Sequence, residues 1–305
     1  MFIDAHTHII ASNAEKQNFL NVSLSLLCSV MNKEEVDYAI VSNIDAIETR
    51  DTECGYEFIN KENSQISLIK SLLEVTKNND KLFILPWCKP NTEGFSKELG
   101  EIILKNRDKI KGLKFHPYHS KLKITGDKIV PYIYFAEKYN LPILVHCAID
   151  EYSQAKYTYE MAKKYPKVKF IMAHLELMQD DFTTARRMLL ELDNLYADTA
   201  WLPFEEVINI IKDGGEDKII FGTDSPINGI DHYEKYRDYF DIKNITKISN
   251  TAYNKLMYKN AIYVYNLKGM WNNSIFIELF HIPYLIFKYF LIIEVVNICF
   301  FMLDC

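Results

Sequence analysis

Two histidines lie two residues apart near the start of the chain, in the stretch MFIDAHTHII. Because alternate residues of a β-strand point to the same face, His6 and His8 would project together if this stretch forms a strand. Two neighbouring imidazoles can bind one metal ion. A single His-x-His pair is a weak signal, so the metal-site hypothesis depends on further ligands elsewhere in the chain.

Further candidates follow short apolar runs later in the chain. They are Lys114 and His116 in GLKFHP, His146 in PILVHC, His174 in KFIMAH and Asp224 in KIIFGTD. Imidazole and carboxylate groups together bind zinc, iron or manganese. Such a site, with three or four protein ligands and one open position, lowers the pKa of water toward ~7 and makes hydroxide available at neutral pH. The residue types therefore favour metal-assisted chemistry.

The elements that must position these residues alternate regularly. We expect strands at residues 2–8, 38–43, 81–87, 112–117, 142–147, 169–174, 194–200 and 218–224. Helical spacing of apolar residues predicts helices at 64–80, 130–140, 154–166, 182–194 and 203–215. Several strand candidates are continuous apolar runs, which are typical of parallel strands buried on both faces.

This alternation predicts a (β/α)₈ TIM barrel. An open doubly wound sheet is the alternative, although no glycine-rich fingerprint follows any predicted strand. In a TIM barrel the C-terminal ends of all strands meet at one face, and active sites lie there. The histidines and Asp224, which are far apart in sequence, would then converge in one pocket.

The motifs FIDAHTH, GLKFHP, LVHC, FIMAH and FGTDSP, in this order, resemble the amidohydrolase superfamily. The resemblance is to the amidohydrolase-related (type 2) branch, which includes aminocarboxymuconate-semialdehyde decarboxylase, and it covers roughly residues 1–267. It implies that His6, His8, His146 and Asp224 are metal ligands. It also implies that His174 polarises substrate or water and that Asp224 is the general base. We expect one divalent metal, zinc in the first place, with a second metal as the alternative.

Lys114 and His116 share strand parity, so both side chains are expected to point into the barrel mouth. Three roles for Lys114 stay open. It could be a buried lysine paired with a carboxylate, it could bind substrate anions, or it could be a carboxylated bridge between two metals, as the resemblance implies for some amidohydrolases. We assign Lys114 and His116 to substrate binding.

Composition limits the class of protein. The chain has 305 residues, a net charge of −6 and a pI near 5.8, which disfavours a nucleic-acid partner. Its six cysteines are scattered without CxxC spacing and indicate reduced thiols. No secretory signal is recognisable at the N-terminus, so we expect a cytoplasmic location. The oligomeric state is left open.

The last residues have a different composition. The stretch 275–303 is almost entirely apolar and is longer than the ~20 residues that a membrane helix needs. Glu278, Lys288 and Glu294 interrupt it, and each would be costly inside a bilayer. We therefore expect a barrel over 1–267 and an apolar helical tail over 268–305 that packs on the barrel or on a partner. A membrane anchor and a non-native tail are the alternatives.

These observations predict a metal-dependent hydrolase that cleaves a small ester, lactone or amide. A metal-dependent decarboxylase at the same site is the first alternative. A TatD-type deoxyribonuclease or other phosphoesterase is the second. That group resembles this chain in the His-x-His pair and the later histidines, but it has a glutamate where this chain has Lys114. The third is a non-enzymatic barrel tethered by its tail, which the intact set of candidate ligands disfavours.

Overall fold

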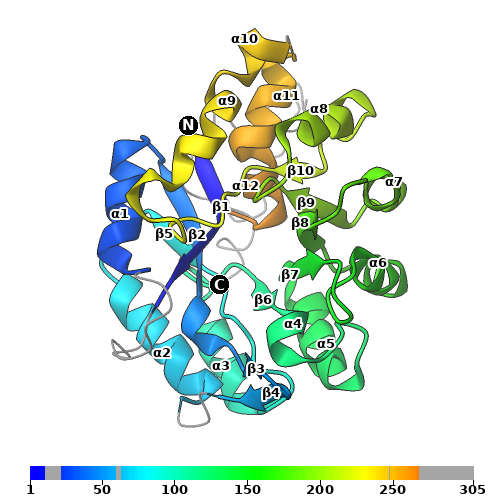
Figure 1. The fold of residues 1–305 in the computed structure, drawn as a ribbon. Coiled ribbons are helices and arrows are strands. Elements are labelled where there is room, and N and C mark those ends of the chain that lie inside the picture. Colours follow the sequence, from blue (N-terminus) through cyan, green and yellow to red (C-terminus); the bar gives the residue numbers. More distant parts are fainter. Residues whose placement is uncertain (11–21, 60–62, 247, 268–305) are drawn as a thin grey trace, which may run out of the picture. The chain divides into compact units, whose positions relative to one another are not determined.

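The computed structural model describes residues 1–10, 22–59, 63–246 and 248–267. Within these ranges, eight parallel strands lie in the interior and helices surround them (Figure 1). The strands are β1 (Ile3–Ile9), β2 (Tyr38–Asn43), β5 (Leu82–Ile84), β6 (Leu113–Phe115), β7 (Ile143–Ala148), β8 (Phe170–Leu177), β9 (Leu195–Asp198) and β10 (Ile219–Ile220).

Backbone contacts join these strands into a ring. Two parallel sheets have the strand orders β1-β2-β5 and β10-β9-β8-β7-β6. On one side, Trp87 pairs with Lys114 and links β5 to β6. On the other side, the backbone N–H of His8 donates to the carbonyl of Ser225 at 2.8 Å, and that of Ala5 to Phe221 at 3.0 Å. The strands therefore close into a barrel, as the sequence predicts.

All eight predicted strands are present, but one boundary matters for the site. Residue 224 was expected at the end of a strand, whereas β10 ends at Ile220 and Asp224 lies in the segment that follows. Asp224 has a φ of 68°, in the left-handed region, so its backbone cannot continue an extended strand. The expected strand end at Asp224 is therefore wrong, although the segment still lies beside β1.

The helices lie outside the ring of strands (Figure 1). The five predicted helices are confirmed as α2 (Gln65–Thr76), α5 (Val130–Tyr139), α6 (Ala155–Lys164), α7 (Thr183–Glu191) and α8 (Phe204–Lys212). The sequence reading missed α1 (Leu24–Lys33) and α3 (Lys97–Lys105). Ser23, Ser64 and Ser96 begin α1, α2 and α3, and each side chain accepts a backbone N–H three residues on.

Shorter elements complete the barrel. An antiparallel hairpin of β3 (Thr49–Thr52) and β4 (Gly55–Phe58) follows β2, and a short helix, α4 (Pro117–Ser120), follows β6. The segment after β10 forms η3 (Gly229–Tyr236), α9 (Arg237–Phe240), α10 (Ile242–Thr246), α11 (Asn250–Asn254), η4 (Lys255–Lys259) and α12 (Asn260–Val264). The hairpin was not predicted, because its exposed strands lack an alternating apolar pattern.

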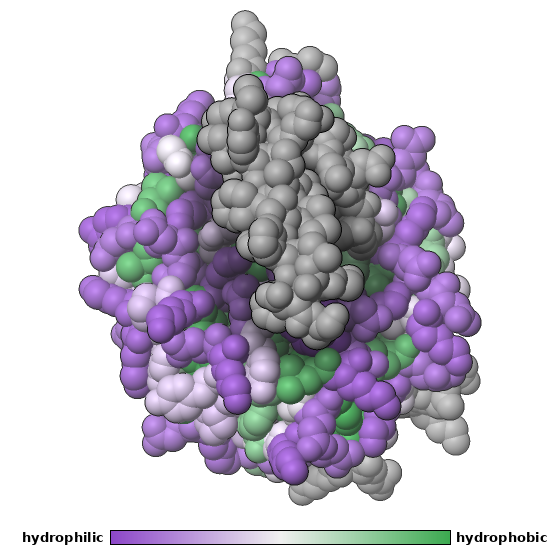
Figure 2. All heavy atoms as spheres, turned by 180° about the vertical axis from the view of Figure 1, so that it is seen from behind, coloured by the Kyte–Doolittle hydropathy of each residue, from purple (hydrophilic) through white to green (hydrophobic). Residues whose placement is uncertain are grey.

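The main hydrophobic core lies between the strands and the surrounding helices. Val41 of β2 and Ile84 of β5 pack in one cluster with Leu72 of α2, and all three are fully buried. Each such side chain contributes roughly 2 kcal/mol of transfer free energy to folding. From behind, the surface outside the grey residues is mainly hydrophilic with scattered apolar patches (Figure 2).

The chain divides into two compact units, Met1–Asn266 and Leu267–Cys305. Among the described residues, no helix is both long enough and apolar enough to cross a membrane. The apolar tail expected over 268–305 lies outside the described residues, so its structure and role stay predictions.

Candidate metal centre

His6, His8 and Asp224 converge at the end of β1. The Nε2 atoms of His6 and His8 are 3.2 Å apart. Asp224 Oδ1 lies 2.8 Å from His8 Nε2 and 3.4 Å from His6 Nε2. All three residues are buried. The structure thus brings three of the four predicted metal ligands together, although Asp224 is more than 200 positions away in the chain.

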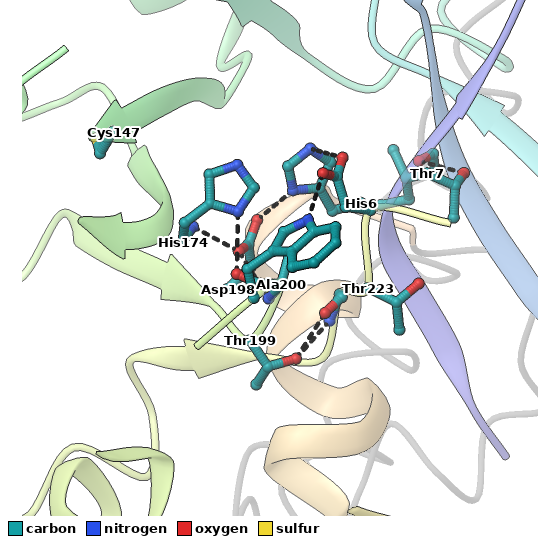
Figure 3. A network of polar contacts seen from close by, with 12 residues as sticks. His6, Thr7, Cys147, His174, Asp198, Thr199, Ala200 and Thr223 are labelled. Carbon is teal, nitrogen blue, oxygen red and sulfur yellow. Dashed lines mark hydrogen bonds and ion pairs between the residues drawn. The ribbon is translucent and has the colours of Figure 1, made fainter. Parts of the chain in front are cut away.

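A second carboxylate orients His6. The Nδ1 of His6 donates to Asp198 Oδ2 at 2.7 Å (Figure 3). Because a carboxylate only accepts, the ring proton of His6 is on Nδ1, and Nε2 presents a lone pair to the centre. For His8, Ser42 offers acceptor oxygens to Nδ1 at 2.9 Å and 3.3 Å, which allows the same tautomer.

His174 lies beside this group on β8. Its Nδ1 donates to the carbonyl of Ala200 at 3.0 Å, and its backbone N–H donates to Asp198 Oδ1 at 2.9 Å (Figure 3). Since the carbonyl fixes the proton on Nδ1, His174 also presents a free Nε2. His6, His174 and Asp198 form a second group whose potential ligand atoms all lie within 4.8 Å of one another.

Asp198 is the residue that sequence reasoning missed. It ends β9, in the stretch NLYADTA that was predicted as a strand, and it is 1% exposed. A signal was available, because a carboxylate at a strand end in a TIM barrel faces the same pocket as the histidines. Chance aspartates at strand ends are common, and the sequence offered no partner for this one.

His146 and His116 form a stack next to the centre. Their rings are 3.7 Å apart and nearly parallel, and the indole of Trp87 stacks on the other side of His116 at 5.0 Å. His146 is also 5.0 Å from the ring of His174. In the described part of the chain, His146 belongs to neither of the groups that could hold a metal. Its role as a ligand therefore stays a prediction.

Lys114 reaches the centre from β6. Its Nζ donates to His6 Nε2 at 3.1 Å, and the side chain is 1% exposed. Burial lowers the pKa of Lys114 to about 8, which Asp224 and Asp198 nearby partly counteract. Among the described residues Lys114 has no carboxylate within ion-pair distance, so the reading of a lysine paired with a carboxylate has no contact in its support.

Asp4 ties β1 to the segment that carries Asp224. Its carboxylate accepts the backbone N–H groups of His6 and Thr223, each at 3.1 Å, and the hydroxyls of Thr223 and Tyr233. Burial raises the pKa of Asp4 to about 7, although these donors act in the opposite direction. Asp4 therefore fixes the backbone at His6 and at Thr223, the residue before Asp224.

The protonation states suit a divalent cation. Burial and the neighbouring Lys114 lower the pKa of His6, and burial lowers the pKa of His174 to about 4. Burial would raise the pKa of Asp224, but His6 and His8 beside it hold that pKa well below its usual range. A neutral imidazole and an ionised carboxylate are the forms that bind metal.

The donor set also fits a metal. His6 Nε2 carries a lone pair and faces an ionised carboxylate oxygen and a second imidazole nitrogen within 3.4 Å. These electron-rich atoms repel one another unless positive charge lies among them, and the Lys114 ammonium, 3.1 Å from His6 Nε2, supplies part of that charge. Two imidazole nitrogens and one carboxylate oxygen are a common ligand set for zinc and related transition metals. Among these residues, His6, His8 and Asp224 could hold such an ion.

Two residues of the site have left-handed backbone conformations. His174 and Asp224 have φ values of 67° and 68°, in a region that non-glycine residues rarely adopt. Strained residues of this kind cost of order 1–3 kcal/mol and cluster at functional sites. The strain supports the functional interpretation of the two residues independently of their side-chain chemistry.

The fold and the site together define a TIM barrel with a buried histidine–aspartate centre at the C-terminal ends of its strands. A family model described as Amidohydrolase matches residues 3–267, and the chain belongs to this family of enzymes. The suspected resemblance is thereby confirmed. No curated protein matches the chain significantly.

Three solved structures with the same fold have 10–13% sequence identity to this chain. A probable 2-pyrone-4,6-dicarboxylic acid hydrolase from Acinetobacter baumannii is 13% identical with a TM-score of 0.59, covering 87% of this chain and 99% of that chain. 5-Carboxyvanillate decarboxylase from Sphingomonas paucimobilis is 10% identical with a TM-score of 0.61, covering 87% and 98%. An amidohydrolase from Burkholderia multivorans with bound zinc is 13% identical with a TM-score of 0.61, covering 88% and 99%. At these identities the similarity shows the fold.

Proposed function

We propose that this protein is a metal-dependent hydrolase of a small organic acid derivative, such as an ester, lactone or amide. The observation that carries the proposal is the convergence of His6 Nε2, His8 Nε2 and Asp224 Oδ1 within 3.4 Å of one another in a buried site. A divalent metal, zinc in the first place, would supply Lewis acidity and make water nucleophilic near neutral pH. His146 is the candidate for a further ligand.

The protein groups would position water and move protons. Asp224 is ionised and can accept a proton in the centre, which is the role of a general base. His174 keeps its own proton on Nδ1 through the bond to Ala200, so its Nε2 can accept a hydrogen bond and orient a water molecule. In this state His174 cannot donate to a developing oxyanion, which leaves that task to Lys114 or to the metal.

Lys114 and His116 are the proposed substrate contacts. The buried Lys114 ammonium would attract a carboxylate because few water molecules screen it. Two proteins of similar structure support a small acidic substrate, since one is described as a probable dicarboxylic acid hydrolase and the other as a carboxyvanillate decarboxylase. No nucleic-acid partner is proposed, and the cytoplasmic location stays a prediction.

Decarboxylation is the second candidate function. Two of the structures with this fold are described as 5-carboxyvanillate decarboxylase and 2,6-dihydroxybenzoate decarboxylase. The same metal site could serve either reaction, because the fold does not select the chemistry. Product analysis separates them: carbon dioxide release from an aromatic or heterocyclic acid would support the lyase, and hydrolysis of a lactone or ester without carbon dioxide release would support the hydrolase.

The first experiment measures metal content and zinc affinity. We expect about one zinc per wild-type chain and at least a hundredfold weaker binding in the His6→Ala/His8→Ala variant. The control is Asp180→Ala, which removes an exposed carboxylate that belongs to neither group of potential metal ligands. Folded wild-type protein that binds no zinc, manganese or iron would refute the metal-dependent mechanism. Two tightly bound metals with activity on phosphodiesters would revive the phosphoesterase alternative.

A further inference from the structure

We infer that Trp201 is a positioning residue for Asp224, an inference that rests on the proposed metal site. The indole Nε1 donates to Asp224 Oδ2 at 2.7 Å. The other oxygen, Oδ1, is the one that faces His8 Nε2 at 2.8 Å. The two oxygens of Asp224 thus have different partners, and the hydrogen bond from the indole to Oδ2 turns Oδ1 toward the histidines.

Trp201 is itself held rigidly in place. Its backbone N–H donates to the hydroxyl of Tyr236 at 2.9 Å, and this hydroxyl donates to the carbonyl of Thr223 at 2.9 Å. Tyr236 is buried and lies on η3. The segment after β9, which carries Trp201, and the segment after β10, which carries Asp224, are thus tied to one anchor. The shared contact with Tyr236 fixes the backbone at Trp201 and at Thr223, and so brings the indole and the carboxylate of Asp224 together.

The exposure of Trp201 argues against a purely packing role. Its side chain is 39% exposed, so burial does not account for its fixed orientation. Its φ of 59° places it in the same left-handed region as His174 and Asp224. The ammonium of Lys235 lies 2.9 Å from the centroid of its ring and holds the indole by a cation–π contact.

The chemistry of the indole determines what the contact can do. An indole N–H only donates, so it accepts no proton from Asp224 and can only hold the carboxylate. With Oδ2 occupied in this way, Asp224 offers the centre a single oxygen. Without this N–H the carboxylate of Asp224 could rotate, and either of its oxygens could then face the histidines. Outer hydrogen bonds of this kind typically contribute 10–100-fold to metal affinity.

The test is the zinc affinity of Trp201→Phe, measured by competition with a chromophoric chelator. Phenylalanine removes the N–H but keeps an aromatic ring beneath Lys235. We expect the zinc dissociation constant to rise 10–100-fold. The control is Tyr134→Phe, which removes a hydrogen-bond donor from an exposed aromatic side chain of α5. Its zinc dissociation constant should stay within about twofold of wild type.

A second measurement follows the response of wild-type protein to zinc and uses Trp201→Phe only to assign one signal. The chain has three tryptophans, and ¹⁵N-indole labelling gives one N–H signal for each. Comparison with Trp201→Phe identifies the Trp201 signal, which should shift on zinc addition as Asp224 engages the metal. An unshifted signal, or unchanged zinc affinity in Trp201→Phe, overturns this inference and leaves the metal site standing. Wild-type protein that binds no zinc overturns both.

Discussion

His6 and Asp198 are 192 positions apart in the sequence and are joined by a 2.7 Å hydrogen bond from His6 Nδ1 to Asp198 Oδ2. This bond selects the tautomer of His6 and therefore decides whether its Nε2 can bind a cation. Asp198 also accepts the backbone N–H groups of His174 and Ala200, so its orientation is fixed. The contact between β1 and β9 is thus part of the candidate site, although the sequence alone does not predict it.

Replacing Asp198 by asparagine tests this contact. Since the oxygen that faces His174 and Ala200 must accept two N–H groups, the amide nitrogen would face His6 Nδ1. That arrangement favours the other His6 tautomer, with the proton on Nε2, which cannot bind metal. We expect Asp198→Asn to fold and to bind zinc 10–100-fold more weakly, as measured by chelator competition. The exposed Asp180→Asn is the matched control, and equal affinities of the two variants would contradict the prediction.

Lys114→Met separates the roles left open for this lysine. If Lys114 only faces the centre, removing its positive charge 3.1 Å from His6 Nε2 should leave zinc binding intact or tighten it. The Michaelis constant for an acidic substrate should rise at least tenfold, because a buried charge-assisted hydrogen bond is lost. Metal analysis and steady-state kinetics measure the two effects. Loss of a metal equivalent in Lys114→Met would instead indicate a carboxylated, bridging lysine.

The backbone at Gly222 packs closely against His6 and Asp198. A Cβ at this position would lie 2.9 Å from the Cβ of His6 and 3.3 Å from the Cβ of Asp198. Gly222→Ala should therefore push these two side chains and lower the free energy of unfolding by about 1–3 kcal/mol. Zinc affinity should fall with it. Urea unfolding of metal-free protein measures the first effect, and unchanged stability together with unchanged zinc affinity would show that the barrel adjusts freely here.

His232 makes a pH-dependent contribution to stability. It is buried, its Nε2 donates to the carbonyl of Thr223 at 2.7 Å, and its Nδ1 accepts the N–H of Asn228 at 3.2 Å. Burial lowers the pKa of His232 to about 4, whereas an unfolded histidine has a pKa near 6.5. Between these values the unfolded state binds more protons, so this contribution is complete above pH 6.5 and is lost as the pH falls toward 4.

The corresponding experiment compares wild type with His232→Gln in urea and EDTA. The variant should be less stable at pH 7.5, and the difference in unfolding free energy should shrink by roughly 2 kcal/mol at pH 5. Comparison of the two proteins is needed because the other buried histidines titrate in the same direction, as the lowered pKa values of His116 and His146 show. A difference that is constant or that grows at acidic pH would contradict the assignment.

The strand pattern and three of the candidate metal ligands were predictable from local sequence. Alternation along a strand places His6 and His8 on one face, and eight apolar runs separated by amphipathic segments predict the barrel. The barrel rule then assigns Asp224 to the same pocket. These inferences need only the period of each element and the sense of parallel strands, which are local properties. The helices α1 and α3 were missed, as was the hairpin of β3 and β4, whose exposed strands lack an alternating apolar pattern.

The tertiary structure decided which of the candidate side chains meet, and in which chemical state. Asp198 selects the tautomer of His6, Trp201 occupies one oxygen of Asp224, and His146 stacks on His116 beside the two potential metal groups. Each of these contacts joins different strands or the segments that follow them. Such contacts depend on strand stagger, on rotamers and on the left-handed φ values of His174, Trp201 and Asp224. Periodicity places a residue on a face of its strand, but only the closed barrel determines its neighbour across the mouth.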